Sequence, residues 1–345
     1  MNINGRKIGP EFPPYIIAEI SANHNGKIDT ALKLIYEAKN NGADAVKIQT
    51  YKPDTITLNS NNDEFIVKDG LWSGRTLYDL YEEAHLPWEW HQQLFDYAKE
   101  IGITIFSSPF DSTAVDLLES LNTPAYKIAS FEIIDLPLIR YVAAKGKPMI
   151  ISTGMANAQE IQEAIDAARQ AGCRDIAILH CVSGYPAPAE DYNLNTIPDM
   201  IARFGVTTGL SDHTLDNTTA ITSIALGSTI IEKHFTLDRN GGGPDDSFSL
   251  QPDDLNALCN GARTAWKSLG KINYDKKDSE KGNLKFRRSL YFVKKISMGE
   301  IITESHIRSV RPGFGAPPKF YDIIIGKKTT RDFNKNEAVD MKYIK

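Results

Sequence analysis

The feature that most constrains the fold is a series of eight short runs rich in Ile and Val within the first 270 residues. The runs occupy residues 15–20, 44–49, 103–107, 125–129, 148–152, 175–181, 206–210 and 229–235. Amphipathic stretches lie between them, for example at 29–41, 87–101, 112–121 and 157–171. Apolar strands that alternate with helices are typical of a parallel sheet buried on both faces. Eight such units in about 250 residues predict an α/β fold of the (β/α)8 TIM-barrel type.

A doubly wound open sheet is the rival architecture. It favours a glycine-rich phosphate loop of the form GxGxxG directly after the first strand. The corresponding stretch here reads AEISANHNG and lacks that pattern. We therefore expect the barrel.

Two segments fall outside the eightfold repeat. Residues 50–86 form a long insertion after the second run, and such an insertion lies on the catalytic face of a barrel. We expect either a lid or a plain surface loop there. After residue 270 the charged stretch 271–285 predicts a linker, so the barrel domain is assigned to residues 1–270. The remaining residues, 286–345, predict a small domain with strand-like runs SLYFVKKI, IITESHIRSV and YDIIIGKK.

The composition argues against several classes of protein. The chain has 345 residues, with 39 Lys and Arg against 44 Asp and Glu, for a formal charge of −5. No cluster of basic residues suggests nucleic-acid binding. No apolar run approaches the ~18 residues of a membrane span, and the first residues do not resemble a signal peptide. Three widely spaced cysteines, Cys173, Cys181 and Cys259, indicate a reducing compartment, so we expect a cytoplasmic protein.

Polar side chains occur at the carboxyl ends of all eight predicted strands. In a barrel these ends converge on one mouth, where enzymes of this fold place their reactive groups. The pattern predicts a functional site that draws on Glu19, Lys47, Gln49, Ser108, Lys127, Ser130, Ser152, Ser183, Tyr185, Ser211, His213, Glu232 and His234.

Lys47 and Lys127 are the most informative of these residues, because a buried ammonium group is costly unless it is paired. Two lysines beside several hydroxyl groups fit the binding of a phosphate or carboxylate. Two alternatives stay open. Each lysine can form a structural ion pair with Glu19, Glu132 or Glu232, or one can act as a Schiff-base lysine.

His213 and His234 end the seventh and eighth predicted strands, which are neighbours in a barrel. Because side chains alternate along a strand, Glu232 and His234 face one way and Lys233 faces the other. Two imidazoles near a carboxylate suit a divalent ion with open coordination positions. General acid–base catalysis and a purely structural role remain open for this pair.

Several ordered motifs resemble the sialic acid synthase family. They read AEISANHNG, ADAVKIQ, FSSPFD, YKIAS, ISTGM, GLSDHT, EKHFT and GGPDDSFSL, and the tail motif RPGFG resembles the family's antifreeze-like SAF domain. The resemblance covers nearly the whole chain. Within the family, LYDLYEEAHLPWEW and PDDSFSL are most similar to the branch that makes pseudaminic acid.

The resemblance implies an enzyme that condenses phosphoenolpyruvate with an N-acetylated amino sugar. It implies a divalent ion (Mn2+, Mg2+ or Co2+) held by His213 and His234, with Glu19 and Glu232 as further catalytic residues. Arg311 matches an arginine that enters the neighbouring subunit's site in a domain-swapped homodimer. Phosphoenolpyruvate contacts are implied for Lys47, Ser108, Lys127, Ser130, Ser152, Ser183 and Ser211. Sugar contacts are implied for Gln49, Glu132, Tyr185, Asp245, Phe248 and Arg311.

Some positions depart from the pattern of the sialic acid enzymes themselves. Ser183 stands where Asn is usual, Ser108 where Thr is common, and Phe248 lies in a stretch that usually contains His. These departures leave the chemistry in place and favour a deoxygenated diacetamido sugar over N-acetylmannosamine. The alternatives are an N-acetylneuraminate or legionaminic acid synthase, an arabinoheptulosonate-type synthase or aldolase, and, more remotely, a non-catalytic carbohydrate-binding protein.

Overall fold

The computed structural model describes residues 1–345, which form two compact units, Met1–Gly270 and Lys271–Lys345. We describe each unit by itself. None of the helices is both long enough and apolar enough to cross a membrane. All three cysteines are buried and free.

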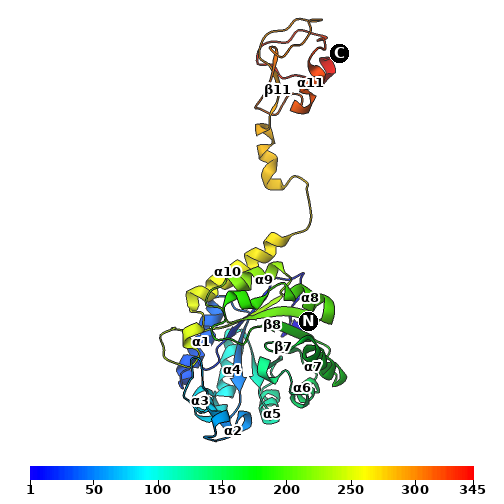
Figure 1. Cartoon of the computed structure of the whole chain (residues 1–345). Helices are drawn as coiled ribbons and strands as arrows, with labels where there is room; N and C mark the ends of the chain where they lie inside the picture. The colour runs from blue at the N-terminus through cyan, green and yellow to red at the C-terminus, as the bar shows by residue number, and fades with distance from the viewer. The chain divides into compact units, whose positions relative to one another are not determined.

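The first unit is a closed barrel of eight parallel strands, which confirms the predicted fold (Figure 1). The strand order around the barrel is β10-β3-β4-β5-β6-β7-β8-β9. Their bounds are β3 Tyr15–Glu19, β4 Ala45–Thr50, β5 Thr104–Pro109, β6 Tyr126–Ile128, β7 Met149–Ser152, β8 Ile176–Cys181, β9 Thr207–Asp212 and β10 Ile230–His234. Each strand overlaps one of the eight predicted runs.

Helices cover the outside of the barrel (Figure 1). They are α1 Ile28–Asn40, α4 His91–Ile101, α5 Ser112–Ser120, α6 Leu136–Ala143, α7 Ala158–Gln170, α8 Thr196–Phe204, α9 Thr218–Ala225 and α10 Pro252–Leu269. Their buried faces pack on the outward-facing strand residues to form the main hydrophobic core. Several begin with a side-chain cap, such as Asp111, which accepts hydrogen bonds from the backbone N–H groups of Thr113 and Ala114 at the start of α5.

The amino-terminal end of the barrel contains a second apolar cluster. Tyr15, Phe106 and Ile150 fill the interior there, together with Ile3 and Ile8 from the start of the chain. Ile3 belongs to a short antiparallel hairpin of β1 (Asn2–Ile3) and β2 (Arg6–Lys7). The sequence analysis did not predict this hairpin. Because apolar side chains fill the amino-terminal end of the barrel, polar groups are left to the opposite, carboxyl-terminal end.

The insertion after β4 is folded. It contains α2 (Pro53–Ile56), a 3-10 turn at Asp63–Phe65, and α3 (Leu77–Ala84). The next 3-10 turn, Trp88–Trp90, leads into α4, so the stretch predicted as one helix from residue 87 is divided in two.

The second unit has its own small core, built from Leu290, Phe292, Ile307 and Phe333 among others. The strands β11 (Ser289–Phe292) and β12 (Ile307–Val310) pair in antiparallel fashion. The third strand-like run was wrongly predicted at its start. Tyr321–Ile324 forms the short helix α11, which continues directly from a 3-10 turn at Pro318–Phe320. A 3-10 helix, Asp278–Phe286, occupies the second half of the predicted linker.

Candidate active site

The carboxyl ends of the barrel strands bring four buried charged side chains together. Glu19 on β3, Lys47 on β4, Lys127 on β6 and Glu232 on β10 are each at most 5% exposed. The strand register places Glu19 beside Lys47 on one side and beside His234 on the other. The groups that the sequence placed at the barrel mouth therefore share one interior.

Lys47 is paired with both glutamates. Its Nζ lies 2.5 Å from Glu19 Oε2 and 3.4 Å from Glu232 Oε1, and it donates a hydrogen bond of 3.3 Å to Ser108 Oγ. Burial alone would lower the pKa of Lys47, but the two carboxylates raise it. Burial and the nearby Glu232 raise the pKa of Glu19. The structural ion pair considered from the sequence is thus present in the structure.

Lys127 has a different environment. Its Nζ donates hydrogen bonds to Ser152 Oγ at 2.7 Å and to the carbonyl oxygen of Ile128 at 2.9 Å. Burial lowers its pKa, and the more distant Glu232 acts in the opposite direction. Because its direct partners are neutral, Lys127 is the cation that an incoming anion can pair with most readily.

A small cradle lies beside Lys127, where β7 ends. The backbone N–H of Gly154 donates to Ser130 Oγ at 3.2 Å, and the buried Ser183 Oγ has no hydrogen-bond partner. A Cβ atom at Gly154 would collide with the Ser183 hydroxyl and lie 2.8 Å from Ser130 Oγ. The glycine therefore keeps space beside both serines, which suits the oxygen atoms of a phosphate or carboxylate. The sequence analysis missed this residue, although the motif ISTGM contains it.

His213 and His234 lie next to each other, with ring centroids 5.4 Å apart. His213 Nδ1 is 2.7 Å from the carbonyl oxygen of Val182, so Nδ1 donates this bond and Nε2 is the nitrogen left for another partner. Burial alone would lower the pKa of His213, but the neighbouring Cys181 and the Val182 carbonyl raise it. His234 Nδ1 is buried without a hydrogen-bond partner, and burial lowers the pKa of His234 well below its usual range. Two adjacent imidazoles fit a divalent metal ion, which binds the neutral form of each ring. No group of three or more His, Cys, Asp or Glu side chains in the structure is arranged to hold one.

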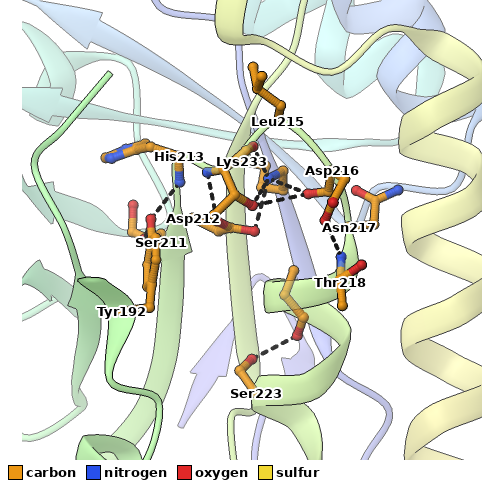
Figure 2. Close-up of polar contacts among 12 residues, drawn as sticks. Tyr192, Ser211, Asp212, His213, Leu215, Asp216, Asn217, Thr218, Ser223 and Lys233 are labelled. Atoms are coloured by element: carbon orange, nitrogen blue, oxygen red, sulfur yellow. Dashed lines mark hydrogen bonds and ion pairs between the residues drawn. The ribbon is translucent and has the colours of Figure 1, made fainter. Parts of the chain in front are cut away.

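Lys233 lies on the other face of β10 from Glu232, as the alternation along the strand predicts. Figure 2 shows Lys233 beside Asp212 and Asp216. Its Nζ forms an ion pair with Asp212 Oδ2 at 2.9 Å and donates to the carbonyl oxygens of Thr214 at 2.6 Å and Asp216 at 2.9 Å. These bonds hold the loop after β9 in place. His213 is in that loop.

The predicted sugar-binding residues form two groups around the mouth. Gln49 Nε2 donates to Glu19 Oε1 at 3.1 Å and to Ser21 Oγ at 2.9 Å, and Ser21 in turn donates to Asp245 Oδ2 at 2.5 Å. Gln49 and Asp245 are therefore connected through Ser21, a residue that the sequence analysis did not select.

Tyr185 and Phe248 form the second group. The Tyr185 ring lies 4.4 Å from His213 and 5.3 Å from Phe248 between centroids. Phe248 also packs against His234 at 5.0 Å and is only 2% exposed. Phe248 therefore packs against the buried side of the Tyr185 ring.

Glu132 and Arg311 are the two other predicted sugar-binding residues. Glu132 follows β6 in a 3-10 turn (Ser130–Glu132), and its Oε2 is buried without a partner. Burial raises the pKa of Glu132 to about 7, and the charge of Lys127 acts against this shift. Arg311 belongs to the second unit, directly after β12.

Ser211 is the remaining residue predicted to contact phosphoenolpyruvate. Its Oγ donates a hydrogen bond to Glu232 Oε1 at 3.4 Å.

The fold and the charged residues of this mouth are those of a (β/α)8-barrel enzyme. The sequence model of the NeuB family matches residues 34–274, and that of the SAF domain matches residues 287–342. The chain belongs to the NeuB family, and its residues 287–342 form a SAF domain.

Named relatives match almost the full chain. This chain is 44% identical to a pseudaminic acid synthase of Campylobacter jejuni, over 94% of this chain and 95% of the relative. A pseudaminic acid synthase of Helicobacter pylori is also 44% identical, over 94% and 96%.

A solved structure agrees with this assignment. The spore coat polysaccharide biosynthesis protein SpsE of Bacillus subtilis is 34% identical with a TM-score of 0.69, over 100% of this chain and 99% of that one.

Proposed function

We propose that the protein is a pseudaminic acid synthase. It condenses phosphoenolpyruvate with 2,4-diacetamido-2,4,6-trideoxy-β-L-altropyranose and water, and it releases pseudaminic acid and inorganic phosphate. The observation that carries the proposal is the convergence of Lys47, Lys127, His213 and His234 in one barrel mouth. The choice of sugar is supported by the 44% identity to pseudaminic acid synthases over nearly the whole chain.

The donors around Lys127 account for binding of phosphoenolpyruvate. This substrate carries a phosphate and a carboxylate, and its charge needs fixed cations and hydroxyl groups in a dry site. Lys127, Ser152 and the cradle of Gly154 with Ser130 and Ser183 form one such set. Lys47 on β4 and Ser108 on β5 form a second set on the adjoining strands. Two sets on different strands hold the two anionic ends of the substrate and fix its orientation.

In the proposed reaction, carbon 3 of phosphoenolpyruvate attacks the aldehyde carbon of the open-chain sugar. Positive charge develops at carbon 2, water adds there, and the tetrahedral intermediate expels phosphate by cleavage of the C–O bond. A divalent ion bound by His213 and His234 would supply Lewis-acid polarisation of the aldehyde. Glu19 accepts a hydrogen bond from Gln49 and pairs with Lys47, so it is placed to take up the proton of the attacking water or supply that of the new hydroxyl group.

A phosphate-release assay tests this function. Purified protein is mixed with phosphoenolpyruvate and, in turn, with N-acetylmannosamine, the diacetamido-altrose and the diacetamido-mannose, with and without EDTA. We expect the fastest release with the diacetamido-altrose and loss of release with EDTA. Preference for N-acetylmannosamine would instead indicate a sialic acid synthase, and preference for the diacetamido-mannose a legionaminic acid synthase. Borohydride trapping of a lysine adduct would indicate an aldolase.

We also propose a homodimer in which Arg311 completes the partner's site. The proposal rests on the resemblance of the RPGFG motif to the family's tail and on the SAF match over residues 287–342. Mixing two inactive variants, Glu19→Gln and Arg311→Ala, tests it. Exchange of subunits restores part of the activity if Arg311 acts in the partner's barrel, because one site per mixed dimer then has both residues. No recovery is expected if it acts within its own chain.

A further inference from the structure

The insertion after β4 reaches over the barrel mouth. Its helix α3 carries Tyr81, whose ring centroid lies 5.8 Å from that of Tyr51 at the end of β4. Burial raises the pKa of Tyr81, and the charge of Glu132 contributes to this shift. A segment that approaches the mouth so closely is available to contact a bound substrate.

A tight hairpin in this insertion presents a tryptophan. The Val67 N–H donates to the carbonyl oxygen of Arg75 at 2.9 Å, and the Gly74 N–H donates to that of Val67 at 2.8 Å. Gly74 has φ of +85°, a left-handed conformation that glycine adopts without strain. Trp72 lies within the turn that these bonds close.

Trp72 contacts the site from two directions. Its indole N–H donates to the carbonyl oxygen of Pro244 at 3.1 Å, and Pro244 directly precedes Asp245. Its ring centroid lies 5.9 Å from that of Tyr185, which itself packs against His213. Trp72 and Tyr185 are both half-buried, whereas Phe248 behind them is buried. The two outer rings therefore still offer apolar surface to a ligand.

We propose that Trp72 is a specificity-determining residue for the acceptor sugar. The rings of Trp72 and Tyr185 form a wall that packs against methyl groups of the acceptor, and the indole N–H holds the loop that carries Asp245. This inference rests on the proposed function, because it names a further residue of the same acceptor site. It also gives the insertion a role that the sequence analysis left open between a lid and a surface loop.

The chemistry of the acceptor favours such a wall. A 6-deoxy sugar with two acetamido groups offers three methyl groups, and aromatic rings bury apolar area at a small cost in conformational entropy. A sugar with a hydroxymethyl group at carbon 6 would have to place a hydroxyl group against the rings without a hydrogen-bond partner, which is unfavourable. Discrimination through a single methyl group typically amounts to about 10–200-fold.

The test compares Trp72→Ala and Trp72→Phe with wild type, with Leu58→Ala as the control. Leu58 lies in the same insertion and is 66% exposed. For Trp72→Ala we expect the KM for the acceptor to rise about tenfold or more, with the KM for phosphoenolpyruvate unchanged. The preference for the 6-deoxy acceptor over N-acetylmannosamine should fall in parallel. Trp72→Phe keeps the aromatic surface and loses the N–H donor. Its acceptor KM and acceptor preference should therefore lie between those of Trp72→Ala and wild type. Leu58→Ala should behave as wild type.

Two results would overturn this assignment in an active enzyme. One is an unchanged acceptor KM and preference in Trp72→Ala, and the other is an equal rise in the KM for both substrates, which indicates a structural role. If Trp72→Ala does not fold, as judged by thermal unfolding, the same criteria apply to Trp72→Phe. A wild-type protein that releases no phosphate with any of the sugars would overturn the proposed function itself, and this inference with it.

Discussion

Lys233 and Asp212 form a buried ion pair across neighbouring strands, with Lys233 Nζ 2.9 Å from Asp212 Oδ2. The two residues are direct register partners of β10 and β9. The same ammonium group bonds two carbonyl oxygens of the loop that follows β9. Lys233 thereby connects the strand that carries His234 to the loop that carries His213.

Replacing Lys233 with Met should destabilise the protein strongly. The substitution leaves the Asp212 carboxylate buried without a counter-ion, and removal of one partner of such a pair typically costs about 3–5 kcal/mol. The double variant Lys233→Met with Asp212→Leu should recover part of this loss, because no unpaired charge remains. Urea unfolding monitored by circular dichroism measures both values. A single variant within about 1 kcal/mol of wild type would contradict this account of the pair.

Glu19→Gln should reduce turnover and leave phosphoenolpyruvate binding nearly unchanged. Glutamine keeps the shape of the side chain but cannot exchange a proton, and its single amide oxygen can replace only one of the two carboxylate oxygens that accept from Lys47 and Gln49. Loss of a general acid or base typically costs about 10²–10⁴-fold in rate. The measurement is kcat and the KM for phosphoenolpyruvate from phosphate release. Activity within about tenfold of wild type would be too high for the proposed role of Glu19.

The sequence predicted the barrel and the identity of its mouth residues because both follow from short-range patterns. Alternation along β10 places Glu232 and His234 on one face and Lys233 on the other, and the structure shows Glu232 beside Lys47 and Lys233 beside Asp212. Glu19, Glu132 and Glu232 were candidate partners of the two lysines, but which of them pairs with which lysine was not predictable. The pairing of Lys47 with Glu19 depends on the register between two strands, which no single strand encodes.

Other features depend on contacts between distant segments. The N-terminal hairpin that closes the lower end of the barrel is too short to have a periodic signal. Trp72 reaches Pro244 across 172 positions of the sequence, so only the folded insertion shows that they meet. Gly154 has no side chain that could be recognised as functional in the sequence. It matters because it leaves space for the hydroxyl groups of Ser130 and Ser183, which only the folded chain brings next to it.

Gly154→Ala should weaken phosphoenolpyruvate binding without unfolding the protein. The added methyl group would displace the hydroxyl groups of Ser183 and Ser130, which can rotate away and so spare the backbone. Each hydrogen bond to a charged ligand group is worth about 1.5–3 kcal/mol, so the KM for phosphoenolpyruvate should rise at least about tenfold. Steady-state kinetics measure this rise, and a melting temperature close to that of wild type serves as the control. An unchanged KM would show that the cradle does not bind this substrate.

The Glu132 carboxyl group should make stability depend on pH. Burial raises its pKa in the folded protein from the ordinary 4.5 to about 7. The unfolded chain then releases the proton first, so the folded state loses stability as the pH rises from about 4.5 to about 7 and loses no more above that. Glu132→Gln removes this loss. The difference in unfolding free energy between Glu132→Gln and wild type should therefore grow in favour of the variant between pH 5 and 7 and then become constant. If the unfolding free energies of Glu132→Gln and wild type changed with pH in the same way across this range, the pKa of Glu132 would not be raised.

Direct metal binding tests the pair of histidines separately from catalysis. His213 has Nδ1 occupied by the carbonyl oxygen of Val182, and His234 has a buried Nδ1 without a partner, so each imidazole offers one free nitrogen atom. Calorimetric titration of the metal-free protein with Mn2+ should show one binding site. His213→Ala or His234→Ala should weaken it by about 100-fold or more, since the loss of even an outer-shell group costs about 10–100-fold. His306→Ala, in the second unit, is the matched control and should bind as wild type does. Equal affinity in all of the variants would mean that any bound ion is held elsewhere.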